Sequence, residues 1–239
     1  MRIKKPKPEP HVPSMPELLR RVPFFSDLDE AAISRFAGLA TAQSFQHEET
    51  IILAGDSRNA VFFITKGQAK IFSDSKSSGG VILSLLGIGD SFGEIQMLSE
   101  TGRSTISVTA EGECSVIIFG AKDFFNEITN NPKLSMEFLK EESRKLNKAY
   151  MQIVSLSKNT IRKRVLSCVM LFAEELGVRV PYGNHRSVIK LRNRPTQEQI
   201  AGMSGTTRET VNRELSSLIK DGYIELTGTD LILLKELPV

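Results

Sequence analysis

The sequence predicts an α+β protein: an N-terminal antiparallel β body, one long helix, and a C-terminal helix-turn-helix with a β wing. Three patterns predict this order. Short β-rich runs recur between residues 45 and 119, a heptad pattern covers 139–156, and two helix caps lie ten residues apart after residue 195. With 239 residues, 40 % of them hydrophobic, the chain is long enough for two ordinary domains. We expect four segments: 1–14, 15–132, 133–158 and 159–239.

The first 14 residues, MRIKKPKPEPHVPS, are basic and rich in proline. Such a segment cannot pack a core, so we expect a flexible arm. It lacks the apolar core of a signal peptide, and apolar runs such as Val81–Leu86 are far shorter than the ~18–20 residues that span a bilayer. We therefore expect a cytoplasmic protein with no membrane partner.

The segment from residue 45 to residue 119 is typical of an antiparallel sandwich, roll or barrel. Two short helical patterns, at 17–21 and 30–39, precede it. Within it, runs such as AVFFITKG, QAKIFSD and CSVIIF alternate with turn glycines that recur every 10–13 residues. A β body of this kind has a concave interior that can hold a small ligand.

The pattern after Ala121 is helical and continues to about Ser157. Within this helix, residues at alternating spacings of three and four form a heptad seam with one polar member: Leu139, Glu142, Leu146, Ala149, Ile153 and Leu156. The seam predicts a homodimer; the alternative is an amphipathic helix docked on its own domain. A second, basic helix over 158–175 and a loop over 177–183 are expected to follow.

Two helix starts near residues 196 and 206 predict a helix-turn-helix. Thr196 is followed three residues later by Gln199, and Thr206 by Glu209, and each pair has the spacing of a capping box. Gly205, directly before the second cap, supplies the tight turn. The two helices are expected to pack through the apolar residues Ile200, Ala201, Met203, Val211, Leu215 and Leu218.

The second of these helices exposes side chains that can read DNA. Arginine can bind guanine in the major groove, glutamate can accept from cytosine, and threonine hydroxyls at the helix starts suit phosphate. The candidate DNA-binding residues are Thr196, Thr206, Thr207, Arg208, Glu209, Asn212 and Arg213. Residues 223–226 and 231–234 predict a small β-hairpin, or wing, after this helix.

The distribution of charge agrees with a polyanion partner for the C-terminal part. Residues 158–222 hold 12 Lys/Arg and 6 Asp/Glu, a local net charge of +6, whereas the whole chain carries +3. The alternative interpretation is a pair of packed helices with a solvated basic surface.

A second motif, FGEIQML followed by GRST, begins at Phe92. Gly93 starts a short helical turn whose N–H groups can approach an anion. Glu94 can accept hydrogen bonds from a sugar hydroxyl, and Arg103 can return across the turn to hold a phosphate. A carboxylate and a guanidinium at this spacing suit a ligand that carries both a sugar hydroxyl and a phosphate. The alternative is a Glu–Arg salt bridge that braces a loop.

Together the two motifs resemble the cyclic-AMP receptor protein/FNR family of bacterial transcription regulators. The resemblance covers about residues 17–235 and is carried by FGEIQML…GRST and by the recognition-helix run TTRETVNREL. It implies a β-roll sensor domain that binds a 3′,5′-cyclic nucleotide, a long dimerisation helix and a winged helix-turn-helix. It also implies double-stranded DNA with a two-fold-symmetric site of TGTGA type as partner, and RNA polymerase as a further one.

The resemblance implies that Gly93, Glu94, Arg103 and Ser104 bind the ribose and the cyclic phosphate. The candidate ligand-binding residues are Phe92, Gly93, Glu94, Ile95, Arg103, Ser104 and Tyr150. In cAMP-responsive members a Thr-Ser pair on the dimer helix binds adenine, but Ala149 and Tyr150 stand there in this chain. Ala149 has no polar side-chain group for a base, whereas Tyr150 can stack on it. Both cAMP and cGMP therefore stay open as effectors.

Other sensing chemistries and enzymes fit the sequence poorly. An iron–sulfur cluster needs about four thiolates, and Cys114 and Cys168 are expected to be buried, inert thiols. His11, His47 and His185 lie in the arm, at a strand edge and in a loop, which does not suit haem. No metal-binding cluster or nucleophile elbow lies near the FGEIQML…GRST motif, called the cassette from here on, so we expect neither a metal nor an enzyme.

The sequence thus predicts a homodimeric regulator in which the effector contacts Glu94, Arg103 and the dimer helix. We expect this contact to change the hinge at 155–160 so that the recognition helices match major grooves about 34 Å apart. Two alternatives stay open: an effector-independent regulator of the same family, and a cyclic-nucleotide adaptor subunit that does not bind DNA.

Overall fold

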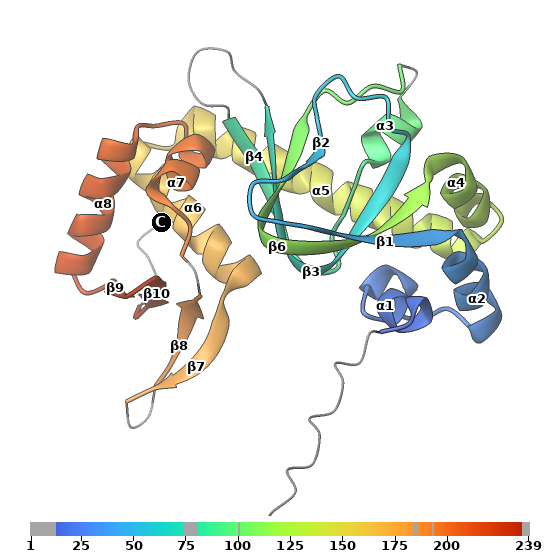
Figure 1. Ribbon diagram of the computed structural model, residues 1–239. Coiled ribbons are helices and arrows are strands. Elements are labelled where there is room, and N and C mark those ends of the chain that lie inside the picture. The colour runs from blue at the N-terminus through green and yellow to red at the C-terminus, as the bar shows by residue number, and fades with distance from the viewer. Residues whose placement is uncertain (1–12, 74–80, 100, 184–185, 193, 236–239) are drawn as a thin grey trace, which may run out of the picture.

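Figure 1 shows a computed structural model that describes residues 13–73, 81–99, 101–183, 186–192 and 194–235. A β-rich N-terminal part, a long helix and a C-terminal part with helices and a small sheet follow one another along the chain. The expected α+β class and the expected order of the parts are confirmed. Residues 1–12 of the expected arm lie outside the described residues.

The N-terminal sheet has six strands, all paired antiparallel, with the order β1-β6-β3-β4. Strand β2 pairs with β6, and β5 pairs with β3. The two longest strands, β3 and β6, span 14 residues each and form the centre of the sheet. The strands are β1 (Ala40–Phe45), β2 (Thr50–Ile52), β3 (Ala60–Ser73), β4 (Val81–Leu86), β5 (Ser91–Phe92) and β6 (Ser107–Gly120).

Helices cover one side of this β body. They are α1 (Met15–Arg20), the 3-10 turn η1 (Pro23–Phe25), α2 (Glu30–Leu39) and α4 (Ala121–Thr129), and they confirm both expected short helices. A cluster of phenylalanine rings joins them to the sheet; the centroids of Phe25 and Phe63, for example, are 5.0 Å apart. A second core fills the inside of the body around Phe62, Phe92 and Val116. Phenylalanine carries the aromatic packing of a chain without tryptophan.

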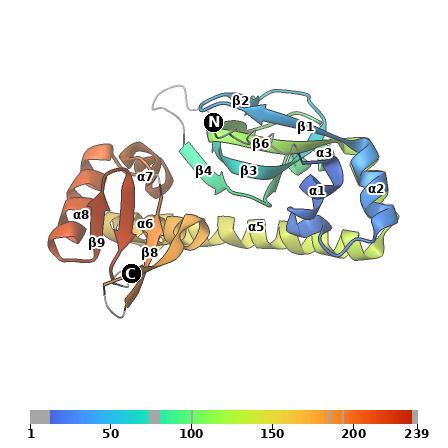
Figure 2. The same ribbon diagram turned by 60° about the horizontal axis from the view of Figure 1, so that its bottom comes forward.

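The long helix α5 (Pro132–Lys158) has 27 residues and extends from the β body to the C-terminal part (Figure 2). Asn131 caps its start by accepting the N–H of Leu134. Only Leu134 and Phe138, in its first two turns, are fully buried. Among the described residues, no helix is both long enough and apolar enough to cross a membrane.

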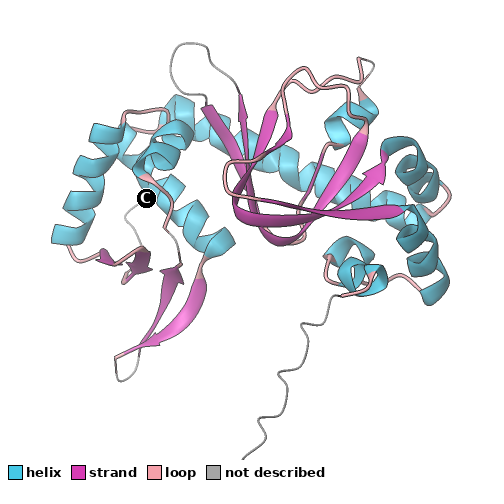
Figure 3. Ribbon diagram, viewed as in Figure 1, coloured by secondary structure: helices cyan, strands magenta, loops and turns pink. Residues whose placement is uncertain are grey.

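The C-terminal part consists of helices packed on a four-stranded antiparallel sheet of order β7-β8-β10-β9 (Figure 3). Its elements are α6 (Ile161–Leu176), β7 (Val178–Tyr182), β8 (Arg186–Leu191), α7 (Gln197–Ser204), α8 (Arg208–Lys220), β9 (Ile224–Thr227) and β10 (Asp230–Leu233). The wing is confirmed as β9 and β10. The loop expected over 177–183 is wrong: residues 178–182 form β7, and Pro181 fits there because an edge strand tolerates a missing N–H donor.

The two parts touch through β4 and α7. Leu85 of β4 belongs to the core of the C-terminal part, and Ile82 packs against it. At Gly202 of α7 an added Cβ would lie 3.5 Å from the side chain and from the backbone nitrogen of Ile82. The helix-turn-helix therefore rests directly on a strand of the β body.

Candidate ligand site and DNA interface

Gly93 fixes the start of α3 (Glu94–Leu98), the short helix of the cassette. Its φ is +90°, and an added Cβ would lie 2.3 Å from the carbonyl oxygen of Ala60 and 3.0 Å from the ring of Phe62. Only glycine satisfies both the backbone angle and the space. The tight turn directs the side chain of Glu94 inward, where the residue is 5 % exposed.

The carboxylate of Glu94 has one bonded and one open oxygen. Oε1 lies 3.0 Å from Nζ of Lys145, which comes from α5. Oε2 is buried and has no hydrogen-bond partner among the described residues. The same Lys145 ammonium donates to Oγ of Ser91 and to Oε1 of Glu142, both at 2.9 Å. An open, buried carboxylate oxygen is a site for a donor such as a hydroxyl group.

Burial and neighbouring charges shift the pKa values of this cluster. Burial raises the pKa of Glu142, and the negative charge of Glu94 adds to the rise; Lys145 acts in the opposite direction with a smaller effect. Burial alone would lower the pKa of Lys145, but the charges of Glu94 and Glu142 outweigh it and the pKa is raised. Lys145 is therefore a firmly charged link between α3 and α5.

Arg103 and Glu94 do not face each other, so the expected carboxylate–guanidinium pair is not formed. Arg103 is exposed, and its Nη1 donates to the carbonyl oxygen of Gly55 at 3.1 Å. Ser104, the next residue, is buried; its Oγ donates to the carbonyl oxygen of Ile106 at 2.6 Å. Since Lys145 neutralises Glu94, the arginine stays available for another anion.

Two residues of this cluster, Lys145 and Gln96, were missed from the sequence. Lys145 follows the seam position Glu142 by three residues, and this spacing was the available signal. Gln96 is the polar residue of FGEIQML and is 2 % exposed. With its amide turned to suit its neighbours, its oxygen accepts from both N and Oγ of Ser104 at 3.1 Å.

The remaining candidate ligand residues lie in different surroundings. Phe92 is buried in the core, stacked on Phe62 with centroids 4.9 Å apart, so its ring is a packing group. Ile95 on α3 is 55 % exposed, and Tyr150 on α5 is 57 % exposed. Ala149, beside Tyr150, is also exposed. The structure thus brings Glu94, Ser104 and Gln96 into the body and leaves Tyr150 on the surface of α5.

The helix-turn-helix has the expected helices, with one cap displaced. Thr196 and Gln199 form the capping box of α7, and Gly205 ends that helix in the left-handed region, with φ +59°. The second cap, expected at Thr206, is wrong by one residue: the side chain of Thr207 caps α8 by accepting the N–H of Thr210. The expected apolar contacts are confirmed, since all six residues are buried.

The outer face of α8 carries the predicted DNA-reading side chains. Arg208, Glu209, Asn212 and Arg213 are all exposed. Gln197 of α7 bridges two of them: its Oε1 accepts from Nε of Arg208 at 3.4 Å, and its Nε2 donates to Oδ1 of Asn212 at 3.0 Å. These contacts hold part of the face in place while leaving the polar groups at the surface.

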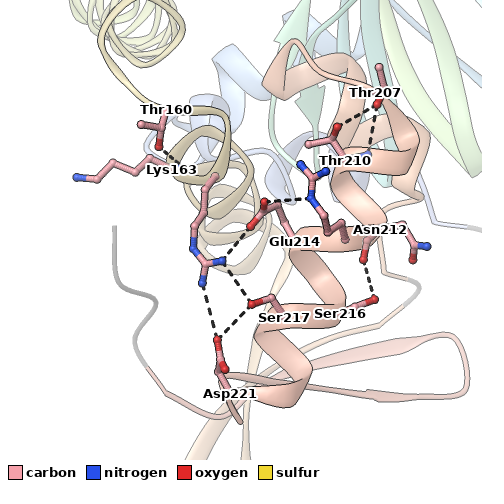
Figure 4. Close-up of polar contacts among 11 residues, drawn as sticks. Thr160, Lys163, Thr207, Thr210, Asn212, Glu214, Ser216, Ser217 and Asp221 are labelled. Carbon is pink, nitrogen blue, oxygen red and sulfur yellow. Dashed lines mark hydrogen bonds and ion pairs between the residues drawn. The ribbon is translucent and has the colours of Figure 1, made fainter.

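The opposite side of α8 is tied to α6 by ion pairs. Glu214, Ser217 and Asp221 lie along this side (Figure 4). Arg162 of α6 donates to Oε2 of Glu214 at 3.0 Å and lies 3.8 Å from Oδ2 of Asp221. Arg213 is also 3.9 Å from Glu214. Arg162, from the basic segment, therefore holds α8 against α6.

Cys114, Cys168 and His47 are the cysteines and the histidine among the described residues. Cys114 and Cys168 are buried free thiols, as expected, and burial raises their pKa values to about 11 and about 12. His47 accepts the N–H of Gly112 at 3.1 Å through Nδ1. Within the described ranges, no group of three or more His, Cys, Asp and Glu residues could hold a metal ion.

Two family models match the chain in succession. A cyclic nucleotide-binding domain matches residues 42–131, and a Crp-like helix-turn-helix domain matches residues 169–238. The first range contains the cassette, and the second contains α7, α8 and the wing.

Curated relatives match this chain over nearly their whole length. The chain is 24 % identical over 219 residues to the CRP-like cAMP-activated global transcriptional regulator of Mycobacterium tuberculosis, covering 92 % of this chain and 95 % of that one. It is 25 % identical over 205 residues to the cyclic AMP receptor protein of Thermus thermophilus, covering 85 % and 88 %. The fold is similar to that of FixK2 from Bradyrhizobium japonicum, with a TM-score of 0.71, 19 % identity and coverage of 82 % and 93 %.

These matches bear out the regulator interpretation over the enzyme and adaptor interpretations, since the relatives are transcription regulators and the DNA-binding domain is present. The chain belongs to the cyclic-AMP receptor protein/FNR family of transcription regulators.

Proposed function

We propose that the protein is a homodimeric transcription regulator whose DNA binding is controlled by a 3′,5′-cyclic nucleotide in the β body. One observation carries the proposal: Glu94 is 5 % exposed and keeps a buried Oε2 with no partner among the described residues. A ribose hydroxyl can supply the missing donor. The N–H and Oγ of Ser104 and the exposed guanidinium of Arg103 then hold the phosphate.

The exposed heptad seam supports the homodimer. Leu139, Leu146 and Ile153 are 59 %, 53 % and 60 % exposed, although α5 lies beside its own β body. Apolar residues at this spacing on a 27-residue helix suit a second copy of the same helix. Two-fold pairing would place two α8 helices on one two-fold-symmetric DNA site.

Helix α5 provides a physical route from the ligand to the DNA interface. Lys145, in the middle of α5, contacts Glu94 of the cassette. Leu156, near the C-terminal end of α5, faces the turn of the helix-turn-helix, since a Cβ added at Gly205 would lie 3.2 Å from Leu156 Cδ2. The helix ends at Lys158, and α6 starts after Thr160, within the expected hinge. A ligand that binds Glu94 more tightly in one position of α5 would shift the DNA-binding part with it.

We assign three working parts to the chain: a sensor at 15–132, a dimer helix at 133–158 and a DNA-binding part at 159–239. The recurring curated description of relatives as cAMP-activated makes cAMP the first effector to test. cGMP is the second, because Ala149 offers no side-chain polar group to either base. RNA polymerase is the further partner expected of such a regulator.

Calorimetric titration with cAMP and, separately, cGMP tests the effector. We expect micromolar binding of one of them and loss of that binding in R103A, since the Arg103 side chain makes one hydrogen bond among the described residues and its removal should leave the fold intact. R35A is the matched control, because Arg35 is an exposed arginine on α2 that pairs with Glu127. Unchanged affinity in R103A would overturn the phosphate assignment.

A second candidate, an effector-independent regulator, is favoured by one observation. Ser104 and Glu94 already have internal partners, Gln96 and Lys145. Absence of heat with both nucleotides, together with tight binding to a specific DNA site, would select this candidate.

A further inference from the structure

Gln96 is a buried polar side chain at the middle of α3 that the proposed mechanism does not use. It is 2 % exposed. With its amide turned to suit its neighbours, its Nε2 donates to the carbonyl oxygen of Arg58 at 2.7 Å, and its Oε1 lies 3.1 Å from both N and Oγ of Ser104. Three contacts on a planar amide fix its orientation. The side chain therefore ties three segments of the cassette together: α3, the loop after β2 and the loop before β6.

The amide oxygen of Gln96 lies 3.1 Å from the two Ser104 atoms, N and Oγ, that the proposed function assigns to the phosphate. A phosphate oxygen bound to Ser104 would accept from the same N–H and the same hydroxyl at about 2.7–3.1 Å. The Gln96 oxygen and a phosphate oxygen cannot both lie about 3.1 Å from N and from Oγ of Ser104, because they would occupy the same space. The ligand and the Gln96 amide therefore compete for Ser104.

Ser104 itself loses little when Gln96 moves away. Its N–H also reaches the carbonyl oxygen of Asp56 at 2.9 Å, and its single hydroxyl hydrogen also reaches the carbonyl oxygen of Ile106 at 2.6 Å. The cost of opening thus falls on the amide of Gln96, which must leave Arg58 and find water or another partner. The Glu94 end of the site differs, because Oε2 of that carboxylate is open already.

The geometry points to Gln96 as a built-in competitor of the cyclic phosphate, which sets the effector concentration at which the protein responds. This inference rests on the proposed function. The apparent affinity is the intrinsic affinity multiplied by the fraction of molecules in which Gln96 has left Ser104. Removing the amide should leave Ser104 accessible in every molecule and so tighten the binding of the nucleotide.

Calorimetry on the full-length chain with cAMP and with cGMP tests this role in two opposite variants. Q96A removes the competing oxygen, and we expect binding about tenfold tighter or more. Q96E has nearly the same size and keeps an acceptor next to Ser104, but its charge repels phosphate, so we expect binding about tenfold weaker or more. L98A is the matched control on the same helix, because Leu98 is 56 % exposed, and its affinity should equal that of the wild type.

The outcomes separate this inference from the proposed function. Equal affinity of Q96A and wild type, with clear binding by both, overturns the role of Gln96 and leaves the sensor intact. Binding by Q96A but not by wild type supports the role of Gln96 and overturns control of the natural chain by these nucleotides. No binding by either overturns the proposed effector and this inference with it. Thermal unfolding of each variant checks that it is folded. If Q96A fails to fold, Q96N takes its place, because its shorter amide cannot reach Ser104.

Discussion

Nζ of Lys145, on α5, lies 3.0 Å from Oε1 of Glu94, on α3. One ion pair thus connects the cassette to the helix that carries the heptad seam. The third member of the cluster, Glu142, is itself a seam residue and accepts from the same ammonium at 2.9 Å. A ligand group that binds Glu94 therefore acts on an interaction that includes the proposed dimer helix.

Replacing Lys145 should destabilise the protein because it leaves the buried carboxylate of Glu94 without its cation. We expect K145M to lower the free energy of unfolding by about 2–4 kcal/mol, and K145R to recover part of the loss. Urea unfolding followed by circular dichroism measures this. K140M is the matched control on the same helix: among the described residues Lys140 pairs only with exposed Glu137, so little change is expected. Equal effects of K145M and K140M would contradict a structural role for the Glu94 pair.

Replacing Glu142 should stabilise the protein at neutral pH. Its raised pKa means that the folded state binds the proton more tightly than the unfolded chain does, so the charged form costs stability above the raised value. We expect E142Q to be more stable than wild type at about pH 7.5, and the difference to shrink as the pH falls to about 4.5. Unfolding free energies at both pH values and at one protein concentration measure this.

Glu137 supplies a comparison of opposite sign on the same helix. The hydrogen bond from Lys140 lowers its pKa, so its contribution is present above pH 4.5 and is lost as the pH falls through the lowered value. E137Q should therefore be slightly less stable than wild type at neutral pH. For Glu142, a lower free energy of unfolding in E142Q than in wild type at neutral pH would contradict the prediction. It would show that the attraction between Glu142 and Lys145 outweighs the cost of burying the Glu142 charge.

Arg208 should determine base preference at one position of the DNA site. With a specific site obtained by selection from random DNA, we expect R208A to lose about 1–3 kcal/mol of binding free energy on that site and much less on a site changed at one base pair. Fluorescence anisotropy at several salt concentrations measures this. An equal loss on every sequence, with a shallower salt dependence, would mark Arg208 as a phosphate contact instead.

A charge in the heptad seam should separate the proposed dimer. We expect wild type to sediment at twice the mass of the chain and L146E to sediment as a monomer, because Leu146 is 53 % exposed in one copy and would face the apolar seam of the second. M151E is the control, since Met151 is 62 % exposed but lies off the seam. A dimeric L146E would place the interface elsewhere.

Much of the DNA-binding part could be predicted because its signals are local. The capping box at Thr196 and the turn at Gly205 each depend on residues within one or two helical turns. The cap at Thr207 instead of Thr206 shows the limit, since two adjacent threonines can both supply the hydroxyl and packing decides between them. The strand β7 was missed because Pro181 and the glycines around it indicate a loop.

The cassette could be located but its internal contacts could not be predicted. Lys145 reaches Glu94 only because α5 passes beside the β body, and the sequence pattern does not contain this tertiary arrangement. Arg103 was expected to face Glu94, but the loop directs it to Gly55, and Lys145 makes the pair instead. Gln96 appears in the motif as an ordinary helix residue until its buried position brings it to Ser104.

The central claim is that a cyclic nucleotide at Glu94, Arg103 and Ser104 controls DNA binding. The most direct measurement is the affinity for the selected DNA site by fluorescence anisotropy, with and without saturating cAMP or cGMP, for wild type and for R103A. We predict that one nucleotide raises the affinity of wild type by about tenfold or more and leaves R103A unchanged. Equal affinity of wild type with and without either nucleotide would contradict the claim and select the effector-independent regulator.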